Sequence, residues 1–128
     1  LMIASRYLKK SKIINWPIQR TILSKLSNLL AKILLNINVS DYTNGYRFYS
    51  KRSVKLILKR CGKIGDGFII LSEILLVIRQ NNYKIGETSS IFINRKRGES
   101  SVNLKLILNS LLGLFKLFLI RINIYPYD

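Results

Sequence analysis

The fold of this chain is decided around N-R-K-R-G-E-S-S, residues Asn94 to Ser101. Upstream of this basic stretch the sequence has mixed helix and strand patterns, and downstream, from Val102 to Tyr125, lies its most sustained apolar segment. Arg95 and Arg97 each offer planar, forked donors to phosphate oxygens, and Gly98 lets the backbone turn toward an anion. The stretch therefore predicts an anion-binding site at a membrane edge, with a solvated basic loop as the alternative.

Composition limits the chain to one small domain or a part of a larger one, since it has 128 residues of which 48% are hydrophobic. Its 22 lysines and arginines against 6 acidic residues give a net charge of +16, which predicts attraction to nucleic acid, anionic lipid or phosphorylated substrates. One cysteine and no histidine exclude an internal disulfide and a zinc cluster. The acidic residues are scattered, so no local motif predicts a catalytic carboxylate pair or an Asp-x-Asp metal site.

The first residues predict a strand that is followed by a loop and a helix. Leu1 to Ala4 resembles the end of a buried strand, so we expect the chain to be a fragment whose sheet begins earlier. Asn15-Trp16-Pro17 indicates a helix start with Asn15 as the cap. Apolar residues at helical spacing from Ile18 to Leu34 then predict a helix that buries a broad face.

A polar stripe follows the same predicted helix. Arg20, Ser24 and Ser27 are spaced i, i+4 and i+7, which places them together on a side away from the apolar residues. One arginine and two hydroxyl groups on one face could hold a phosphate. A merely solvated face is the alternative that spacing leaves open.

The middle of the chain combines a turn, two helices and strand pattern. Asp41 to Tyr49 places four aromatic residues around an Asn-Gly turn, either as core or as the wall of a sugar or nucleotide site. Lys51 to Lys59 predicts a short helix, and Phe68 to Ile78 predicts a buried one. Glu73 within the latter is expected to brace a loop through a salt bridge, with general base as the alternative. Tyr83 to Asn94 predicts one strand or a bent pair of strands.

The apolar tail predicts a helix that lies in a membrane surface. Its longest uncharged run, Leu106 to Phe115, is shorter than the ~20 residues that span a bilayer. Interrupting cations such as Lys105 and Lys116 can extend to lipid headgroups from an in-plane helix. A helix packed on the domain or on a partner is the alternative. We accordingly divide the chain into residues 1–103, an α/β unit, and residues 104–128, an amphipathic or hydrophobic tail.

Six separated motifs together resemble the dolichyl-phosphate (polyprenyl-phosphate) mannosyltransferases, which are inverting family 2 glycosyltransferases with a GT-A fold. In chain order they are Ser5-Arg6-Tyr7, Asn15-Trp16 with Arg20 and Ser24, Asp41-x-Thr43-x-Gly45-Tyr46-Arg47-x-Tyr49, Gly67-Phe68 with Glu73, Ile85-Gly86-Glu87, and Arg95-x-x-Gly98-Glu99-Ser100. Each motif is weak alone, and the shared order over about residues 3 to 120 carries the resemblance. It implies that the chain is the C-terminal half of the catalytic domain.

The resemblance also implies roles for individual residues. The residues implied to gather around the donor pyrophosphate and the lipid phosphate are Arg6, Arg20, Ser24 and Arg95. The residues implied to line the substrate, including the wall of the sugar site, are Asp41, Gly45, Arg47, Tyr49, Lys96 and Ser100. Two departures stand out: Ser101 replaces a lysine that is usual after Gly-Glu-Ser, and Thr88-Ser89-Ser90 replaces the usual Val-Pro-Ile.

The implied reaction transfers mannose from GDP-mannose to dolichyl or polyprenyl phosphate with inversion. It implies a divalent metal, Mg²⁺ or Mn²⁺, for the complete enzyme, with ligands outside this chain. It further implies association with a membrane surface, with the active site on the cytosolic side of the endoplasmic reticulum or of a prokaryotic plasma membrane. An N-terminal half or accessory membrane subunits are possible partners, whereas nucleic acid is not expected. The alternatives are a polyprenyl-phosphate transferase for another sugar and a noncatalytic basic fragment that binds membrane or nucleic acid.

Overall fold

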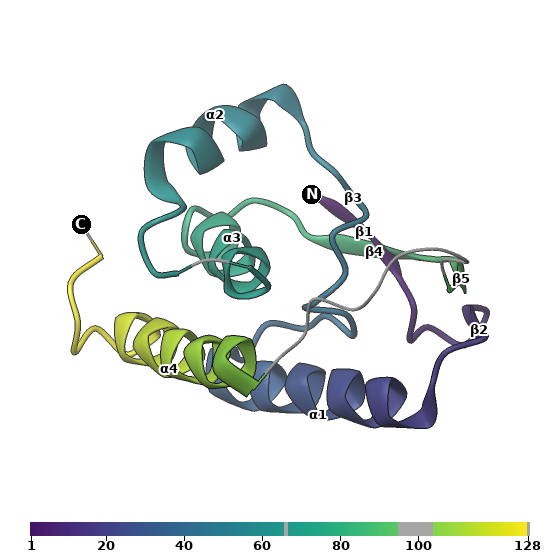
Figure 1. Ribbon diagram of the computed structural model, residues 1–128. Helices are drawn as coiled ribbons and strands as arrows, with labels where there is room; N and C mark the ends of the chain where they lie inside the picture. The colour runs from purple at the N-terminus through teal and green to yellow at the C-terminus, as the bar shows by residue number, and fades with distance from the viewer. Residues whose placement is uncertain (66, 95–103, 128) are drawn as a thin grey trace.

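The described part of the chain forms a mixed α/β structure of small sheets and four helices, as the sequence predicts. The computed structural model describes residues 1–65, 67–94 and 104–127. In these ranges the elements follow one another as β1 (Met2–Ser5), β2 (Lys12–Ile14), α1 (Ile18–Leu35), β3 (Arg47–Phe48), α2 (Lys51–Arg60), α3 (Ile69–Gln80), β4 (Gly86–Ser89), β5 (Ile91–Ile93) and α4 (Leu104–Arg121). Figure 1 shows α1 and α4 along the lower edge, with α3 between them and α2.

Two small sheets hold the strands together. The larger sheet has the order β3-β1-β4, in which β1 pairs antiparallel with β3 and parallel with β4. The smaller sheet pairs β2 with β5 in parallel, with Lys12 opposite Ile91. The predicted strand at the start of the chain is thus confirmed, and the region from Tyr83 to Asn94 forms the bent pair of strands. Strand β2 was not predicted, because the segment between the first strand and the first helix was expected to be a loop.

Helix α1 differs from its prediction in two ways. Pro17 occupies the cap position without a side-chain hydrogen bond, while Asn15 adopts a left-handed conformation with φ of 59°, so the predicted Asn15 cap is wrong. The predicted broad buried face is also wrong, because the apolar residues that share one side of α1 are between 51% and 70% exposed. These residues, called here the outer stripe of α1, are Ile18, Ile22, Leu26, Leu29 and Ile33. The helix buries Asn28, Ala31 and Leu35 instead.

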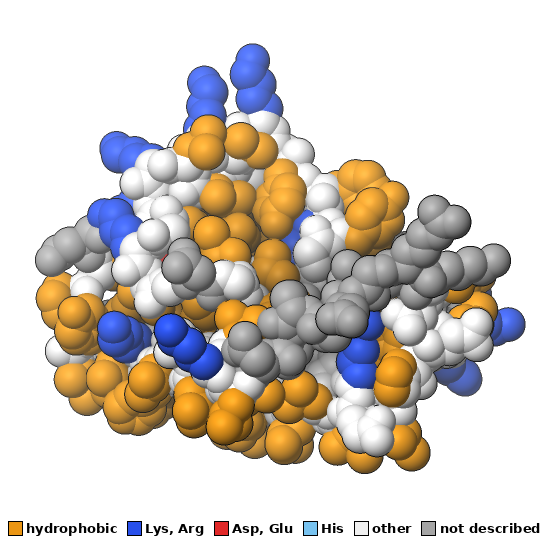
Figure 2. Space-filling model, in the orientation of Figure 1, with side chains coloured by type: hydrophobic (Ala, Val, Ile, Leu, Met, Phe, Trp, Pro, Cys, Tyr) orange, Lys and Arg blue, Asp and Glu red, His pale blue; other side chains and the backbone are white. Residues whose placement is uncertain are grey.

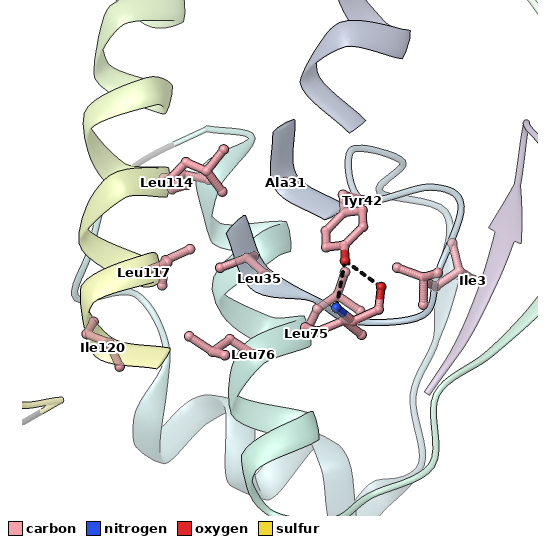
Figure 3. Packing of buried hydrophobic residues seen from close by; sticks show 12 residues of the cluster. Ile3, Ala31, Leu35, Tyr42, Leu75, Leu76, Leu114, Leu117 and Ile120 are labelled. Carbon is pink, nitrogen blue, oxygen red and sulfur yellow. Dashed lines mark hydrogen bonds between the residues drawn. The ribbon is translucent and has the colours of Figure 1, made fainter. Parts of the chain in front are cut away.

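The hydrophobic core lies where α1, α3 and α4 meet. Leu114, Leu117 and Ile120 of α4 point toward Leu35 of α1 and Leu76 of α3 (Figure 3). Tyr42 is fully buried beside them, and its hydroxyl donates to the carbonyl of Ile37 at 2.7 Å and accepts from the amide of Ile37 at 3.2 Å. Burial raises the pKa of Tyr42 to about 12.

Helix α4 has one face in this core and one face outside it. The residues that are between 45% and 72% exposed, called here the outer stripe of α4, are Leu104, Leu108, Leu111, Leu112 and Phe115. Figure 2 shows hydrophobic side chains gathered along the lower edge of the molecule, where Figure 1 places α1 and α4. The structure therefore confirms a helix in the tail, and one face of it packs on the domain, which was the alternative; its contact with a membrane surface stays a prediction. Its assignment as a separate unit of residues 104–128 stays a prediction.

The helices are joined closely at two points. Gly113 of α4 faces Ile69 of α3 so tightly that an added Cβ would lie 2.6 Å from Ile69 Cγ1. Arg121, in the last turn of α4, donates to the carbonyl of Leu34 near the end of α1 at 2.8 Å. Together these contacts fix α4 against both α1 and α3.

Glu73 is fully buried in α3 and braces a loop, as the sequence predicts. Its carboxylate accepts from the backbone amides of Gly62 and Lys63 at 2.9 and 3.2 Å, and from the hydroxyl of Tyr127 at 2.7 Å. Backbone amides and a phenol therefore satisfy this carboxylate, in place of the salt bridge that the sequence analysis expected.

We expect Leu117→Ala to lower the free energy of unfolding by about 2–5 kcal/mol, because Leu117 is fully buried and its removal leaves a cavity. Leu112→Ala on the same helix is the matched control, since Leu112 is 64% exposed and should change stability by less than about 0.5 kcal/mol. Urea unfolding of the two variants measures the difference. Equal small effects would show that α4 does not belong to the core in solution.

Candidate functional site

A buried ion pair fixes the residues at the carboxyl end of β1. The guanidinium of Arg6 donates from Nε and one terminal nitrogen to the two oxygens of Asp41, at 2.8 and 2.7 Å. The backbone amide of Arg6 also donates to Asp41 at 2.9 Å, and Thr43 Oγ1 accepts from the guanidinium at 2.8 Å. Asp41 is fully buried and Arg6 nearly so, which makes the contact a bidentate pair in the interior.

The residues after Asp41 continue this interior network. Asn44 donates from its backbone amide to Asp41 at 3.1 Å and from its side chain to the carbonyl of Ala4. Arg47 is buried and donates to three backbone carbonyls, those of Tyr42, Asn44 and Leu71, at 2.7 to 2.9 Å. Burial lowers the pKa of Arg47. Asp41 and Arg47 thus hold the segment in place, and their predicted contact with a sugar stays a prediction.

Helix α1 presents its polar stripe to the interior of the protein. Arg20, Ser24 and Ser27 are only partly exposed and face the same region as Arg6. The hydroxyl of Tyr7 donates to Ser24 Oγ at 2.6 Å, and Arg20 donates to Asn94 Oδ1 at 3.2 Å. This face therefore lines a pocket, and its predicted contact with a phosphate stays a prediction.

The pocket has a volume of about 150 Å³ and lies among α1, α3 and α4. Its polar lining comes from Arg6, Arg20, Ser24, Ser27, Thr43, Ser72 and Ser110, and its apolar lining includes Leu30, Ile69, Leu106, Ile107, Leu111 and Leu114. Arg20 and Leu30 are ten residues apart on α1, which corresponds to about 15 Å along the helix axis. Cations therefore lie toward the start of α1, and apolar side chains of α4 lie toward its end.

The structure brings together three of the four residues implied to bind phosphate, namely Arg6, Arg20 and Ser24. The fourth, Arg95, lies outside the described residues, as do Lys96 and Ser100. Gly45 is exposed, and nothing lies within 4 Å of the Cβ that another residue would add there. Tyr49 is partly exposed and interacts with Arg47.

No group of three or more histidine, cysteine, aspartate or glutamate residues converges on a possible metal position within residues 1–65, 67–94 and 104–127. The two innermost carboxylates already have partners, since Asp41 binds Arg6 and Glu73 binds backbone amides. The described residues thus do not fit a Mg²⁺ or Mn²⁺ site. That the metal ligands of a complete enzyme lie outside this chain stays a prediction.

Sequence reasoning missed two residues that organise the pocket. Asn28 accepts from the amide of Tyr42 at 2.5 Å and donates to the carbonyl of Ser24 at 2.7 Å, which ties α1 to the segment after Asp41. An asparagine within an apolar helical stretch was the available signal. Trp16 was named at the helix start and in the motif with Arg20 and Ser24 but was given no role in the site, yet two guanidinium groups lie over its ring.

Among the known proteins that this chain is similar to are two that each match over 80% of its length. An undecaprenyl-phosphate mannosyltransferase of Micrococcus luteus is 31% identical over 104 residues, which are 80% of this chain and 42% of that protein. A polyprenol monophosphomannose synthase of Mycolicibacterium smegmatis is 29% identical over 103 residues, or 80% of this chain and 38% of that protein. The chain spans about two fifths of the length of these relatives. No family model and no solved structure matches it.

We expect Asp41→Asn to lower the free energy of unfolding by about 3–5 kcal/mol, because it leaves the charge of Arg6 buried without its carboxylate. The double variant Arg6→Met/Asp41→Asn removes both charges and keeps an amide oxygen as acceptor for the backbone amide of Arg6 or Asn44, so it should recover much of this loss. Chemical unfolding of both variants tests the expectation. A double variant that is less stable than Asp41→Asn would contradict it.

Proposed function

Because the chain is related over four fifths of its length to two polyprenyl-phosphate mannosyltransferases, we propose that it is the C-terminal half of the GT-A catalytic domain of such an enzyme. The proposed reaction transfers mannose from GDP-mannose to dolichyl or polyprenyl phosphate with inversion. The alternative within the same class is a different sugar nucleotide with the same acceptor. Because the chain spans about two fifths of its relatives, we propose that it is inactive alone and needs an N-terminal half.

The observation that carries the proposal is the pocket with cations toward one end and apolar side chains toward the other. A polyprenyl phosphate has the same two parts, a phosphate and a hydrocarbon chain. Arg20, Ser24 and the edge of Arg6 would bind the phosphate through charge-assisted hydrogen bonds. Leu30, with the side chains of α4, would contact the first isoprenoid units.

The proposed reaction needs cations more than a general base, which suits the lining that the described residues give the pocket. The nucleophile is a phosphate oxygen, which is largely anionic near neutral pH because the second pKa of a phosphomonoester is about 6. The task of the protein is to hold this oxygen in line with the sugar and to offset the repulsion between two phosphate groups. Arg20 supplies positive charge at that position, whereas the charge of Arg6 is offset by its pair with Asp41. The Mg²⁺ or Mn²⁺ expected in the complete enzyme would be bound by residues outside this chain.

The exposed apolar residues in the outer stripes of α1 and α4 favour contact of these helices, which also line the pocket, with a lipid surface. Two adjacent helices expose apolar residues on their outer sides, and Lys25, Lys32, Lys105 and Lys116 are exposed on the same helices. Apolar side chains with lysines beside them are typical of helices that lie in the headgroup region of anionic membranes. None of the helices formed by the described residues is both long and apolar enough to cross a bilayer. We propose that both helices, and not the tail alone, contact the membrane on its cytosolic side.

A chimera provides the test of the reaction. The matching 104 residues of the Micrococcus luteus relative are replaced by those of this chain, and mannose transfer to undecaprenyl phosphate is measured. We expect transfer by the chimera and none by the 128-residue chain. Arg20→Ala in the chimera should lower the rate roughly a hundred- to thousandfold, as loss of a charge-assisted phosphate contact does in a dry site. Arg20→Lys should be nearly as damaging if the contact is bidentate.

Arg52→Ala is the matched control, because Arg52 is exposed on α2, outside the pocket, and should cost little. Equal small losses for Arg20→Ala and Arg52→Ala would contradict a specific role for Arg20. A folded chimera with no transfer, or transfer by the isolated chain, would contradict the proposed half-domain.

The membrane contact is tested separately on this chain. Ile22→Ser/Leu29→Ser removes two apolar side chains from the outer stripe of α1 and should weaken binding to anionic vesicles by about tenfold or more, measured by co-sedimentation. Leu58→Ser is the matched control, since Leu58 is 80% exposed on α2, away from both stripes. If Leu58→Ser weakened binding as much as the double variant, the stripe would have no specific role. Tighter, salt-sensitive binding to RNA than to vesicles would instead favour a nucleic-acid-binding fragment.

A further inference from the structure

The two arginines of the pocket share one aromatic ring. The Cζ atom of Arg20 lies 4.4 Å from the centroid of the Trp16 ring, and that of Arg6 lies 5.2 Å from the same centroid. Trp16 itself lines the pocket beside both arginines. Both distances are within the ~6 Å at which a cation is attracted to the face of an aromatic ring. Trp16 therefore contacts both guanidinium groups at the proposed phosphate site.

The position of the indole is itself fixed from several sides. Phe92 of β5 packs edge-on against Trp16, with ring centroids 5.3 Å apart and an interplanar angle of 79°. The backbone before Trp16 is left-handed at Asn15, and the backbone after it is restricted by Pro17. Few conformations are open to the tripeptide, so the ring has a defined place relative to α1.

The Trp16 ring contacts both Arg6, whose orientation is constrained, and Arg20. Arg6 is held by its bidentate pair with Asp41, so its guanidinium has a fixed orientation. Arg20 starts from the first turn of α1 and reaches the same ring from the other direction along the chain. The indole thus relates the position of Arg20 to that of the buried Arg6–Asp41 pair.

An aromatic ring suits this purpose for an electrostatic reason. A carboxylate holds an arginine more strongly, as Asp41 holds Arg6, and its full negative charge reduces the attraction of that arginine for an incoming phosphate. The face of an indole carries only a partial negative potential, which offsets some of the repulsion between two cations while their net charge remains. Arginines held by a ring therefore remain able to bind an anion.

We propose that Trp16 is a positioning residue of the acceptor site, which orients the Arg20 guanidinium toward the phosphate of an isoprenyl phosphate. This role rests on the proposed function, because it assumes that the pocket binds such a phosphate. Trp16 acts through Arg20 and needs no contact with the ligand. Its removal should matter only when Arg20 is present.

The geometry is tested first, without any ligand. Protons of the Arg20 side chain that lie over the indole should show an upfield ring-current shift in NMR spectra of the 128-residue chain. The shift should disappear in Trp16→Leu and be smaller in Trp16→Phe. Unshifted Arg20 protons in the wild-type chain would overturn the proposal and leave the proposed function intact.

The role is then tested by binding of geranyl phosphate, a short isoprenyl monophosphate, measured by calorimetry. We expect Trp16→Leu to raise the dissociation constant about 5- to 30-fold, and Trp16→Phe to raise it about two- to fivefold because a smaller ring remains. In an Arg20→Ala background the effect of Trp16→Leu should fall below about twofold. Tyr83→Leu is the matched control, since it removes the ring under Arg52, another arginine–aromatic pair outside the pocket.

Each outcome decides between the possibilities. If Trp16→Leu bound geranyl phosphate as tightly as the unchanged chain does, the positioning role would be overturned. Binding of geranyl phosphate by the unchanged chain would still support the proposed acceptor site. An equal loss in the presence and absence of Arg20 would also overturn the positioning role, because the indole would then act on the ligand or on the fold. If Trp16→Leu did not fold, an unchanged affinity in Trp16→Phe would overturn the role. Absence of wild-type binding would overturn the proposed acceptor site and this role together, whereas the NMR result would still report the geometry.

Discussion

The bidentate pair between Arg6 and Asp41 is the interaction on which the rest of the site depends. It joins the end of β1 to a segment 35 residues later, and a carboxylate without exposure accepts three hydrogen bonds from one arginine. Taking both charges out of water is costly, so such a pair contributes more to a unique arrangement than to stability. Once it is formed, Thr43 and Asn44 have fixed positions, and they in turn contact Asn28 and Ala4.

The arginines of the site have two different roles, since some hold the backbone in place and one lies at the pocket. Arg47 and Arg6 are largely occupied with backbone carbonyls and with Asp41, so they hold the backbone. Arg20 lies at the pocket with an aromatic ring and an asparagine as neighbours. A chain with a net charge of +16 can therefore place its cations in distinct environments, although composition alone describes them as one basic surface.

Sequence patterns predicted the elements better than their orientation. Period and propensity identified α2, α3, α4 and β1, because each is signalled by residues close in sequence. Spacing also grouped Arg20, Ser24 and Ser27 correctly. It could not show that this group faces inward while the outer stripe of α1 faces outward, since periodicity defines which residues share a face but not what covers it. The usual assumption that the apolar face is buried failed at α1 for this reason.

Long-range partners set the other limit of sequence reasoning. Arg6 resembled a phosphate ligand, and nothing near it in sequence indicated that Asp41 would occupy its fork. Strand β2 was missed because three residues pair with β5 nearly 80 positions later, a contact without a local signal. The order of separated motifs nevertheless identified the polyprenyl-phosphate mannosyltransferases as relatives, because that order reflects common ancestry and does not require knowledge of any contact.

The contact of Gly113 with Ile69 has a consequence for the width of the pocket. Because Gly113 has no side chain, the backbone of α4 packs directly against the side chain of Ile69 on α3. Helix α4 also forms one wall of the pocket through Ser110, Leu111 and Leu114. The distance between α3 and α4 therefore contributes to the width of the pocket, in which we propose that a hydrocarbon chain lies. A related chain with alanine or serine at this position would hold the helices farther apart, and it would accommodate a bulkier or more branched lipid through a change that touches no ligand.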